Sequence, residues 1–147
     1  MGTKTVIVYA STHHGNTKKL LDAIAKENEV ELVDITENEK YDLSDFDRIG
    51  IASGIAFGKY YPEMLKFLEE NIPENKEVFF IHTAGSPREN HADKAKEITT
   101  QRNCRSLGVF FCKGFDTYGP FKVIGGINKR RPDEEDIKKA CQFYQGL

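Results

Sequence analysis

The most informative stretch of the chain reads Val6-Ile-Val-Tyr-Ala-Ser-Thr-His-His-Gly-Asn-Thr17. It begins with an apolar run rich in β-branched residues, which predicts a buried strand over 5–9. Small and hydroxyl residues around Gly15 then form a polar loop, and the spacing of Leu20, Leu21 and Ile24 predicts an amphipathic helix over 16–27. The first N–H groups of a helix carry partial positive charge and have no acceptor within the helix. This order of strand, polar loop and helix predicts a phosphate-binding site.

The rest of the chain alternates short apolar runs with amphipathic segments. Further strands are expected over 30–35, 48–52, 78–81 and 107–112, and further helices are expected from Pro62, over 92–102 and from Asp133. This alternation predicts a mainly parallel sheet with helices on both faces, folded as a single domain over 1–147. The first, third and fourth strands each end in a loop of small residues or glycine. Ligands of such sheets bind beyond the carboxyl ends of the strands, so the three loops are expected to share one site.

Composition excludes several classes of protein. With 21 Lys and Arg against 23 Asp and Glu, the net charge is −2, which argues against nucleic acid as a partner. No apolar run approaches the length of a membrane span, and the amino terminus does not resemble a signal peptide. The three cysteines have neither paired nor metal-binding spacing, which favours a reducing cytoplasm and predicts no metal site.

The loop after the first strand resembles that of the flavodoxin family, in particular the short-chain flavodoxins. Flavodoxins carry Thr/Ser-x-Thr-Gly-x-Thr there, and this chain has Thr12-His13-His14-Gly15-Asn16-Thr17. His14 stands where the family usually has Thr, which removes one hydroxyl donor and adds an imidazole. That imidazole would either donate a charge-assisted bond to a phosphate or, like His13, point into water. The resemblance implies a flavodoxin-like α/β fold, with a doubly wound, five-stranded parallel sheet of order 2-1-3-4-5, helices on both faces and bound FMN.

The resemblance also divides the cofactor among the three loops. The first loop would hold the FMN phosphate, the second would wrap the isoalloxazine edge that carries N5, and the third would form the opposite wall. No catalytic residue and no metal ligand is expected. The expected cofactor-binding residues are Ser11, Thr12, His13, His14, Gly15, Asn16, Thr17, Ser53, Gly54, Ile55, Ala56, Phe57, Gly58, Thr83, Ala84, Gly85 and Ser86.

Two expectations concern details of the ring site. Gly54 and Gly58 are expected to permit a positive φ in the second loop, or simply to make a tight turn. The chain has no Trp, the residue that flavodoxins often place near the ring, so other aromatics are candidates to contact it. They are Phe57, Tyr60 and Tyr61 in the second loop, and Phe115, Tyr118 and Phe121 in the long Gly114–Pro132 loop, unless these last three pin that loop to the core. The basic run Lys129-Arg130-Arg131 is either a solvated turn or a contact for an acidic partner or a phosphate.

Three functions remain open from the sequence. The leading interpretation is a cytoplasmic electron carrier that shuttles electrons through non-covalently bound FMN between redox partner proteins, a reductase and an acceptor. The alternative is an FMN-dependent oxidoreductase, such as an NAD(P)H:quinone or related dehydrogenase with a small quinone-type substrate. The mild net charge and the long Gly114–Pro132 loop favour this alternative. The third is an interaction domain that binds no flavin.

Overall fold

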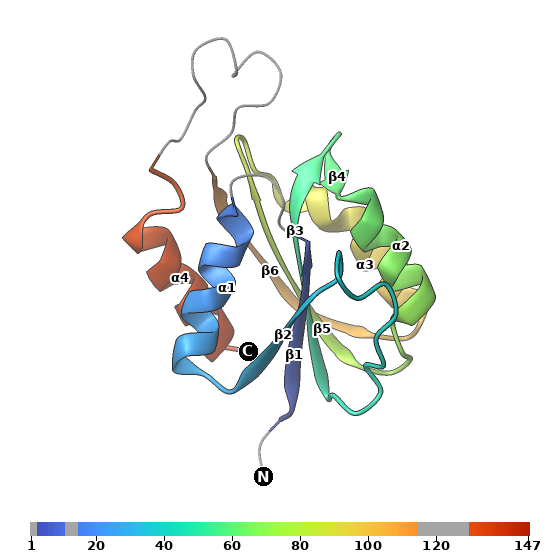
Figure 1. Cartoon of the computed structure of the whole chain (residues 1–147). Helices are drawn as coiled ribbons and strands as arrows, with labels where there is room; N and C mark the ends of the chain where they lie inside the picture. The colour runs from blue at the N-terminus through green and yellow to red at the C-terminus, as the bar shows by residue number, and fades with distance from the viewer. Residues whose placement is uncertain (1–2, 11–14, 115–129) are drawn as a thin grey trace.

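The computed structural model describes residues 3–10, 15–114 and 130–147. These residues form a sheet covered by helices on both faces (Figure 1). Within the described ranges, no helix is both long and apolar enough to cross a membrane. Along the chain the elements are β1 (Thr5–Ala10), α1 (Asn16–Glu27), β2 (Val30–Asp34), β3 (Arg48–Ala56), β4 (Lys59–Tyr60), α2 (Pro62–Asn71), β5 (Glu77–Ala84), the 3-10 turn η1 (Glu89–Ala92), α3 (Asp93–Thr100), β6 (Arg105–Lys113) and α4 (Glu134–Gln145).

The sheet has the order β2-β1-β3-β5-β6, and each neighbouring pair along this order is parallel. Counted over these five strands, the order is the expected 2-1-3-4-5. The short strand β4 was not predicted, and it pairs antiparallel with the end of β3. The chain leaves β1 for β2 on one side and returns to β3 on the other. The order therefore reverses between β1 and β3, which is where sheets of this kind bind ligands.

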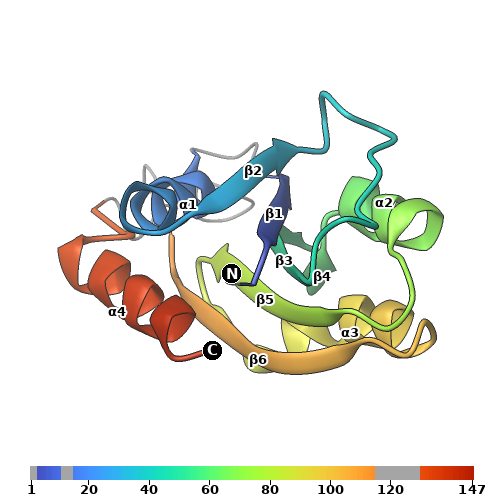
Figure 2. The same cartoon turned by 90° about the horizontal axis from the view of Figure 1, so that it is seen from below.

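Two helical layers cover the sheet (Figure 2). Helices α1 and α4 lie on one face, and α2 and α3 lie on the other. β1 is buried along its whole length because its side chains alternate between these layers. Val6 and Val8 belong to the core under α2 and α3, whereas Ile7 packs under α1 with Leu20, Leu21 and Ile24, as the helical spacing predicted.

Two strands extend further at their carboxyl ends than the sequence predicted. β3 continues to Ala56 rather than ending at Ala52, and β5 continues to Ala84 rather than ending at Ile81. Ser53 and Gly54 stay in parallel register with β5, and the next two residues pair with β4. The prediction of a loop over 53–58 was therefore wrong for residues 53–56. Small residues are typical of loops, but pairing with neighbouring strands overrides that preference.

Candidate functional site

The carboxyl ends of β1, β3 and β5 bring three predicted segments to one end of the sheet, the upper end in Figure 1. Thr17 in the first turn of α1 and Thr83 near the end of β5 lie with their hydroxyl oxygens 2.9 Å apart. Both side chains are buried, so one hydroxyl donates to the other and joins α1 to β5. The predicted residues Thr17 and Thr83 thus meet at this end of the sheet. We call this end the carboxyl rim.

Gly114, at the end of β6, extends this junction. Its N–H donates to the Ala84 carbonyl oxygen at 3.0 Å. A Cβ added to Gly114 would lie 2.6 Å from Nδ2 of the Asn16 side chain, so glycine allows the two segments to touch. The start of α1 is therefore packed against the ends of both β5 and β6.

The start of α1 has the chemistry of an anion site. Gly15 is the N-cap residue, with a left-handed φ of 65°, and its carbonyl accepts the Lys19 N–H at 3.2 Å. The first turn contains no acidic residue, and the exposed Lys18 and Lys19 follow directly. Positive helix-end charge is therefore not cancelled by a carboxylate in that turn.

The predicted phosphate residues Ser11, Thr12, His13 and His14 lie outside the described residues. The expected role of His14 toward a phosphate therefore stays a prediction.

The predicted second loop is a β-hairpin whose turn is Phe57-Gly58. Both residues have positive φ, 55° and 76°, between the paired Ala56 and Lys59, which is the geometry of a type I′ turn. Gly58 adopts this conformation without cost, whereas a bulky aromatic there is uncommon. The Phe57 side chain is 92% exposed, so the hairpin presents an aromatic ring to solvent at the carboxyl rim.

Ser53 and Gly54 differ from the prediction. Ser53 is fully buried, and its hydroxyl donates to the Gly54 carbonyl at 2.6 Å and accepts the Tyr61 N–H at 3.0 Å. Gly54 belongs to β3 and is not among the glycines with positive φ, and a positive φ at this residue stays a prediction. Glycine is needed there because an added Cβ would lie 2.3 Å from the Tyr61 hydroxyl oxygen. Both residues hold the hairpin together, and Ile55 and Ala56, half-buried, continue its strand.

The three candidate aromatics of this hairpin differ in how far they are buried. Tyr60 is buried, and its hydroxyl lies 3.1 Å from Nδ1 of His82, so Tyr60 is a packing residue of the core. Tyr61 is half-buried against Gly54. Phe57 is the exposed member of the three.

The opposite wall is the segment that follows β5. Ala84 is half-buried, Gly85 is buried and Ser86 is exposed. Since β3 and β5 are neighbouring parallel strands, this segment and the hairpin lie side by side at the carboxyl rim (Figure 1).

His82 was missed as a functional candidate. It is fully buried, and its Nε2 lies 2.7 Å from the Arg88 carbonyl oxygen. A signal was present in the sequence, because His82 shares a strand face with Val78 and Phe80 and must therefore point into the core. A buried imidazole requires polar partners, and those partners connect separate parts of the site.

Of the predicted basic run 129–131, the structure describes Arg130 and Arg131. Arg131 donates to Asp136 through Nε at 2.5 Å and through its terminal nitrogen at 2.7 Å, so it anchors the start of α4. Lys129 and the aromatics Phe115, Tyr118 and Phe121 lie outside the described residues.

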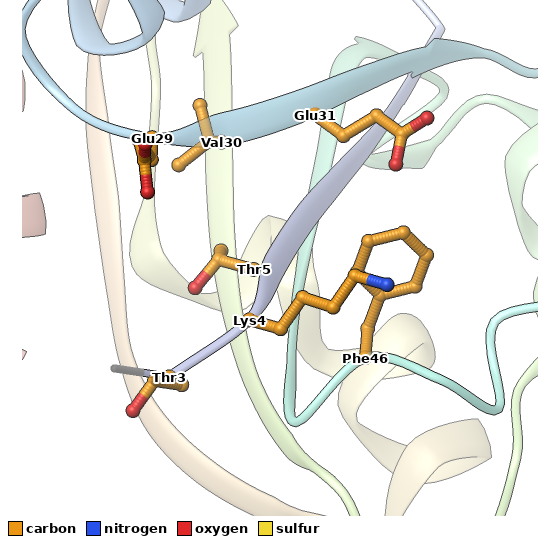
Figure 3. A pocket seen from close by; sticks show the side chains of 7 residues that line it. All are labelled: Thr3, Lys4, Thr5, Glu29, Val30, Glu31 and Phe46. Atoms are coloured by element: carbon orange, nitrogen blue, oxygen red, sulfur yellow. The ribbon is translucent and has the colours of Figure 1, made fainter. Parts of the chain in front are cut away.

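A hollow of about 550 Å³ lies at the opposite, amino end of the sheet (Figure 3). Its lining includes the carboxylates of Glu29 and Glu31. The Lys4 side chain crosses the ring of Phe46, with Nζ 5.0 Å from the ring centre. Two carboxylates and a lysine held over an aromatic ring are poorly suited to a phosphate, so the hollow is not the predicted cofactor site.

Comparison with known proteins agrees with this geometry. Residues 6–114 match the flavodoxin domain. The chain belongs to the flavodoxin family. It is 38% identical over 146 residues to the uncharacterised protein MJ0298 of Methanocaldococcus jannaschii, which covers 98% of this chain and 97% of that relative.

Two solved structures share the flavodoxin fold. Oxidised Flavodoxin 2 from Bacillus cereus matches with a TM-score of 0.66 and 21% identity, covering 98% of this chain and 99% of that one. A flavoprotein from Lactobacillus acidophilus NCFM, solved in complex with FMN, matches with a TM-score of 0.57 and 18% identity. That match covers 75% of this chain and 93% of the other.

Proposed function

We propose that this flavodoxin binds FMN non-covalently at its carboxyl rim and carries electrons through it. The observation that carries the proposal is the convergence of the α1 start, the Phe57-Gly58 turn and the segment after β5 where the strand order reverses. Family membership and the FMN complex of a protein with the same fold support this choice of cofactor.

The start of α1 fits the phosphate of FMN. Gly15, the N-cap residue of α1, has the left-handed φ of 65° that glycine adopts most readily. Backbone N–H groups of the first turn would bind the phosphate, and Lys18 and Lys19 add positive charge at the same end. Lys18 is also paired with Asp22 at 3.0 Å, so its contribution is attenuated.

The hairpin and the segment after β5 fit the isoalloxazine ring. Bound FMN supplies the one- and two-electron chemistry, and the protein sets its environment. The exposed ring of Phe57 would cover one side of the site, and the backbone of Ala84, Gly85 and Ser86 would bound the other. An aromatic face disfavours negative charge beside it, so Phe57 would raise the free energy of the reduced anionic flavin.

Among the described residues near the rim, two titratable groups favour a carrier over an enzyme. Tyr60 and His82 are buried and bonded to one another, so neither is placed to exchange a proton with a substrate. The net charge of −2 favours the alternative, an NAD(P)H:quinone oxidoreductase, because it provides little steering toward a basic partner protein.

One preparation tests both functions. The purified protein is titrated with FMN by flavin fluorescence, and the loaded protein is then mixed with NADH or NADPH and a quinone. We expect tight one-to-one binding of FMN and slow NAD(P)H oxidation until a separate reductase is added. Rapid turnover without a reductase would replace the carrier by the oxidoreductase, and absence of FMN binding would remove both.

A further inference from the structure

We propose that His82 is a positioning residue that fixes the two walls of the flavin ring site relative to each other. The inference rests on the proposed function, because it assigns those walls to FMN. His82 is fully buried near the end of β5 and would not itself touch the ring. It acts through Tyr60, which follows the hairpin turn, and through Arg88, which follows the segment after β5.

Two hydrogen bonds make this connection. A carbonyl oxygen can only accept, so Nε2 of His82 donates its proton to the Arg88 carbonyl at 2.7 Å. The other ring nitrogen, Nδ1, therefore accepts from the Tyr60 hydroxyl at 3.1 Å. Each wall is bonded to a different edge of the same imidazole.

The imidazole stays in this neutral form at neutral pH. Burial lowers the pKa of His82 to about 4, although the bond to the Arg88 carbonyl opposes the shift, and His91 and Lys96 lower it further. The N–H of Arg88 is bonded as well, because it donates to Nδ1 of His91 at 3.2 Å. Near pH 7, protonation of His82 therefore does not break its bonds to Tyr60 and Arg88.

Aromatic packing fixes the orientation of the ring. Phe111 of β6 stacks on His82 with ring centres 5.3 Å apart and an angle of 9°. Tyr60 and His91 meet it edge-on, with ring centres at 5.4 Å and 5.6 Å. A phenyl ring is close to an imidazole in size and shape, so what histidine adds is the pair of directional hydrogen bonds.

Four variants separate positioning from packing. His82→Phe keeps an aromatic ring and removes both bonds. His82→Asn carries its amide near the former Nδ1 and keeps the Tyr60 bond, whereas His82→Gln reaches the former Nε2 position and keeps the Arg88 bond. The control Phe79→Leu alters the core on the opposite face of β5, where Phe79 packs against Phe143 and Tyr144.

The FMN-free protein is examined by amide hydrogen exchange, and the FMN-bound protein by dissociation constant and midpoint potential. We expect His82→Phe to speed exchange in both the hairpin and segment 85–91, to weaken FMN binding about tenfold as expected for a lost buried hydrogen bond, and to shift the potential. His82→Gln should loosen mainly the hairpin, and His82→Asn mainly segment 85–91. Phe79→Leu should change exchange in the core without this pattern.

Two results would overturn the proposal. One is a His82→Phe protein whose FMN affinity, potential and wall exchange match those of Phe79→Leu. The other is His82→Gln and His82→Asn proteins that loosen the same segment. Failure of the wild-type protein to bind FMN would instead contradict the proposed function, and hydrogen exchange in the FMN-free protein would still decide whether His82 joins the two segments.

Discussion

The two ends of the sheet each contain a buried threonine, and the two hydroxyls differ in their hydrogen bonding. At the carboxyl rim, Thr17 is 1% exposed and its hydroxyl is bonded to Thr83 at 2.9 Å. At the amino end, Thr5 is 4% exposed, and its hydroxyl has no hydrogen-bond partner among the residues that the structure describes. The hydroxyl of Thr17 therefore joins α1 to β5, whereas the hydroxyl of Thr5 joins no segment that the structure describes.

The two ends of the sheet also differ in their acidic residues. The first turn of α1 at the carboxyl rim lacks acidic residues, whereas Glu29 and Glu31 line the hollow at the amino end. A parallel sheet gathers its loops and helix N-termini at its carboxyl end, so an anionic ligand finds favourable dipoles there. A hollow in the surface therefore need not be the site with the suitable chemistry.

The largest expected effect concerns pH. Folding lowers the pKa of His82 from 6.5 to about 4, so below pH 6.5 the unfolded chain binds a proton that the folded chain does not. The free energy of unfolding should fall by up to roughly 3 kcal/mol as the pH drops from 6.5 to 4, and this contribution should then level off. Urea denaturation at several pH values measures the slope of the unfolding free energy against pH.

His82→Asn is the matched control for that slope, since it removes the titrating group. His91, whose pKa burial also lowers, remains in the variant, as do Tyr60, Arg88 and Lys96 around the site. The difference between the two curves therefore isolates His82. Parallel curves over this pH range would show that His82 is not held neutral by the fold.

The next effect compares two glycines of one hairpin. Gly54→Ala places a Cβ 2.3 Å from the Tyr61 hydroxyl oxygen, and overpacking of this kind costs about 2 kcal/mol. Gly58→Ala meets no described atom within 4 Å but must keep a φ of 76°, which costs about 1 kcal/mol. Denaturation with urea gives both values, and a larger loss for Gly58→Ala would contradict the close approach of Tyr61.

The two threonines provide the third prediction. Thr17→Val leaves the Thr83 hydroxyl without its partner and should cost about 1 to 2 kcal/mol of unfolding free energy. Thr5→Val removes a hydroxyl that makes no bond to a described residue, so stability should change by less than about 0.5 kcal/mol or rise slightly. Equal losses in the two variants would remove the contrast between the two ends.

The smallest effect on stability belongs to Phe57, and it should oppose the effect on binding. Phe57→Asn introduces the residue that type I′ turns prefer before glycine, so stability should rise by about 0.5 kcal/mol. FMN binding should weaken severalfold because the exposed ring is lost. A variant that is more stable and binds FMN equally well would show that Phe57 does not contact the flavin.

Much of the architecture could be predicted because periodicity and caps are local signals. The bounds of α1 follow from its apolar stripe and the preceding Gly15, and they agree with the structure. The last helix was expected from Asp133, and this residue is its N-cap, with Oδ1 accepting the Asp136 N–H at 3.0 Å. The alternation of strands and helices predicted the parallel sheet with helices on both faces, and the strand order was implied by the family resemblance.

The remaining features depend on contacts between distant residues. β4 has two residues, and its Phe57-Gly58 turn lacks the Asn-Gly pair that usually marks such hairpins. Ser53 and Gly54 have the composition of a loop, yet pairing with β5 keeps them in a strand. The bonds of His82 join residues 22 and 6 positions away, which no local pattern encodes.

The most direct test follows backbone amide resonances of the isotope-labelled protein during titration with FMN. The account predicts shifts at Gly15 and Thr17, at the Phe57-Gly58 turn, and at Ala84 to Ser86, all saturating together at one FMN per chain. Resonances of Thr5 and Glu31 at the amino end should stay in place. Shifts confined to the amino end, or no shifts at saturating FMN, would contradict the assignment of the cofactor to the carboxyl rim.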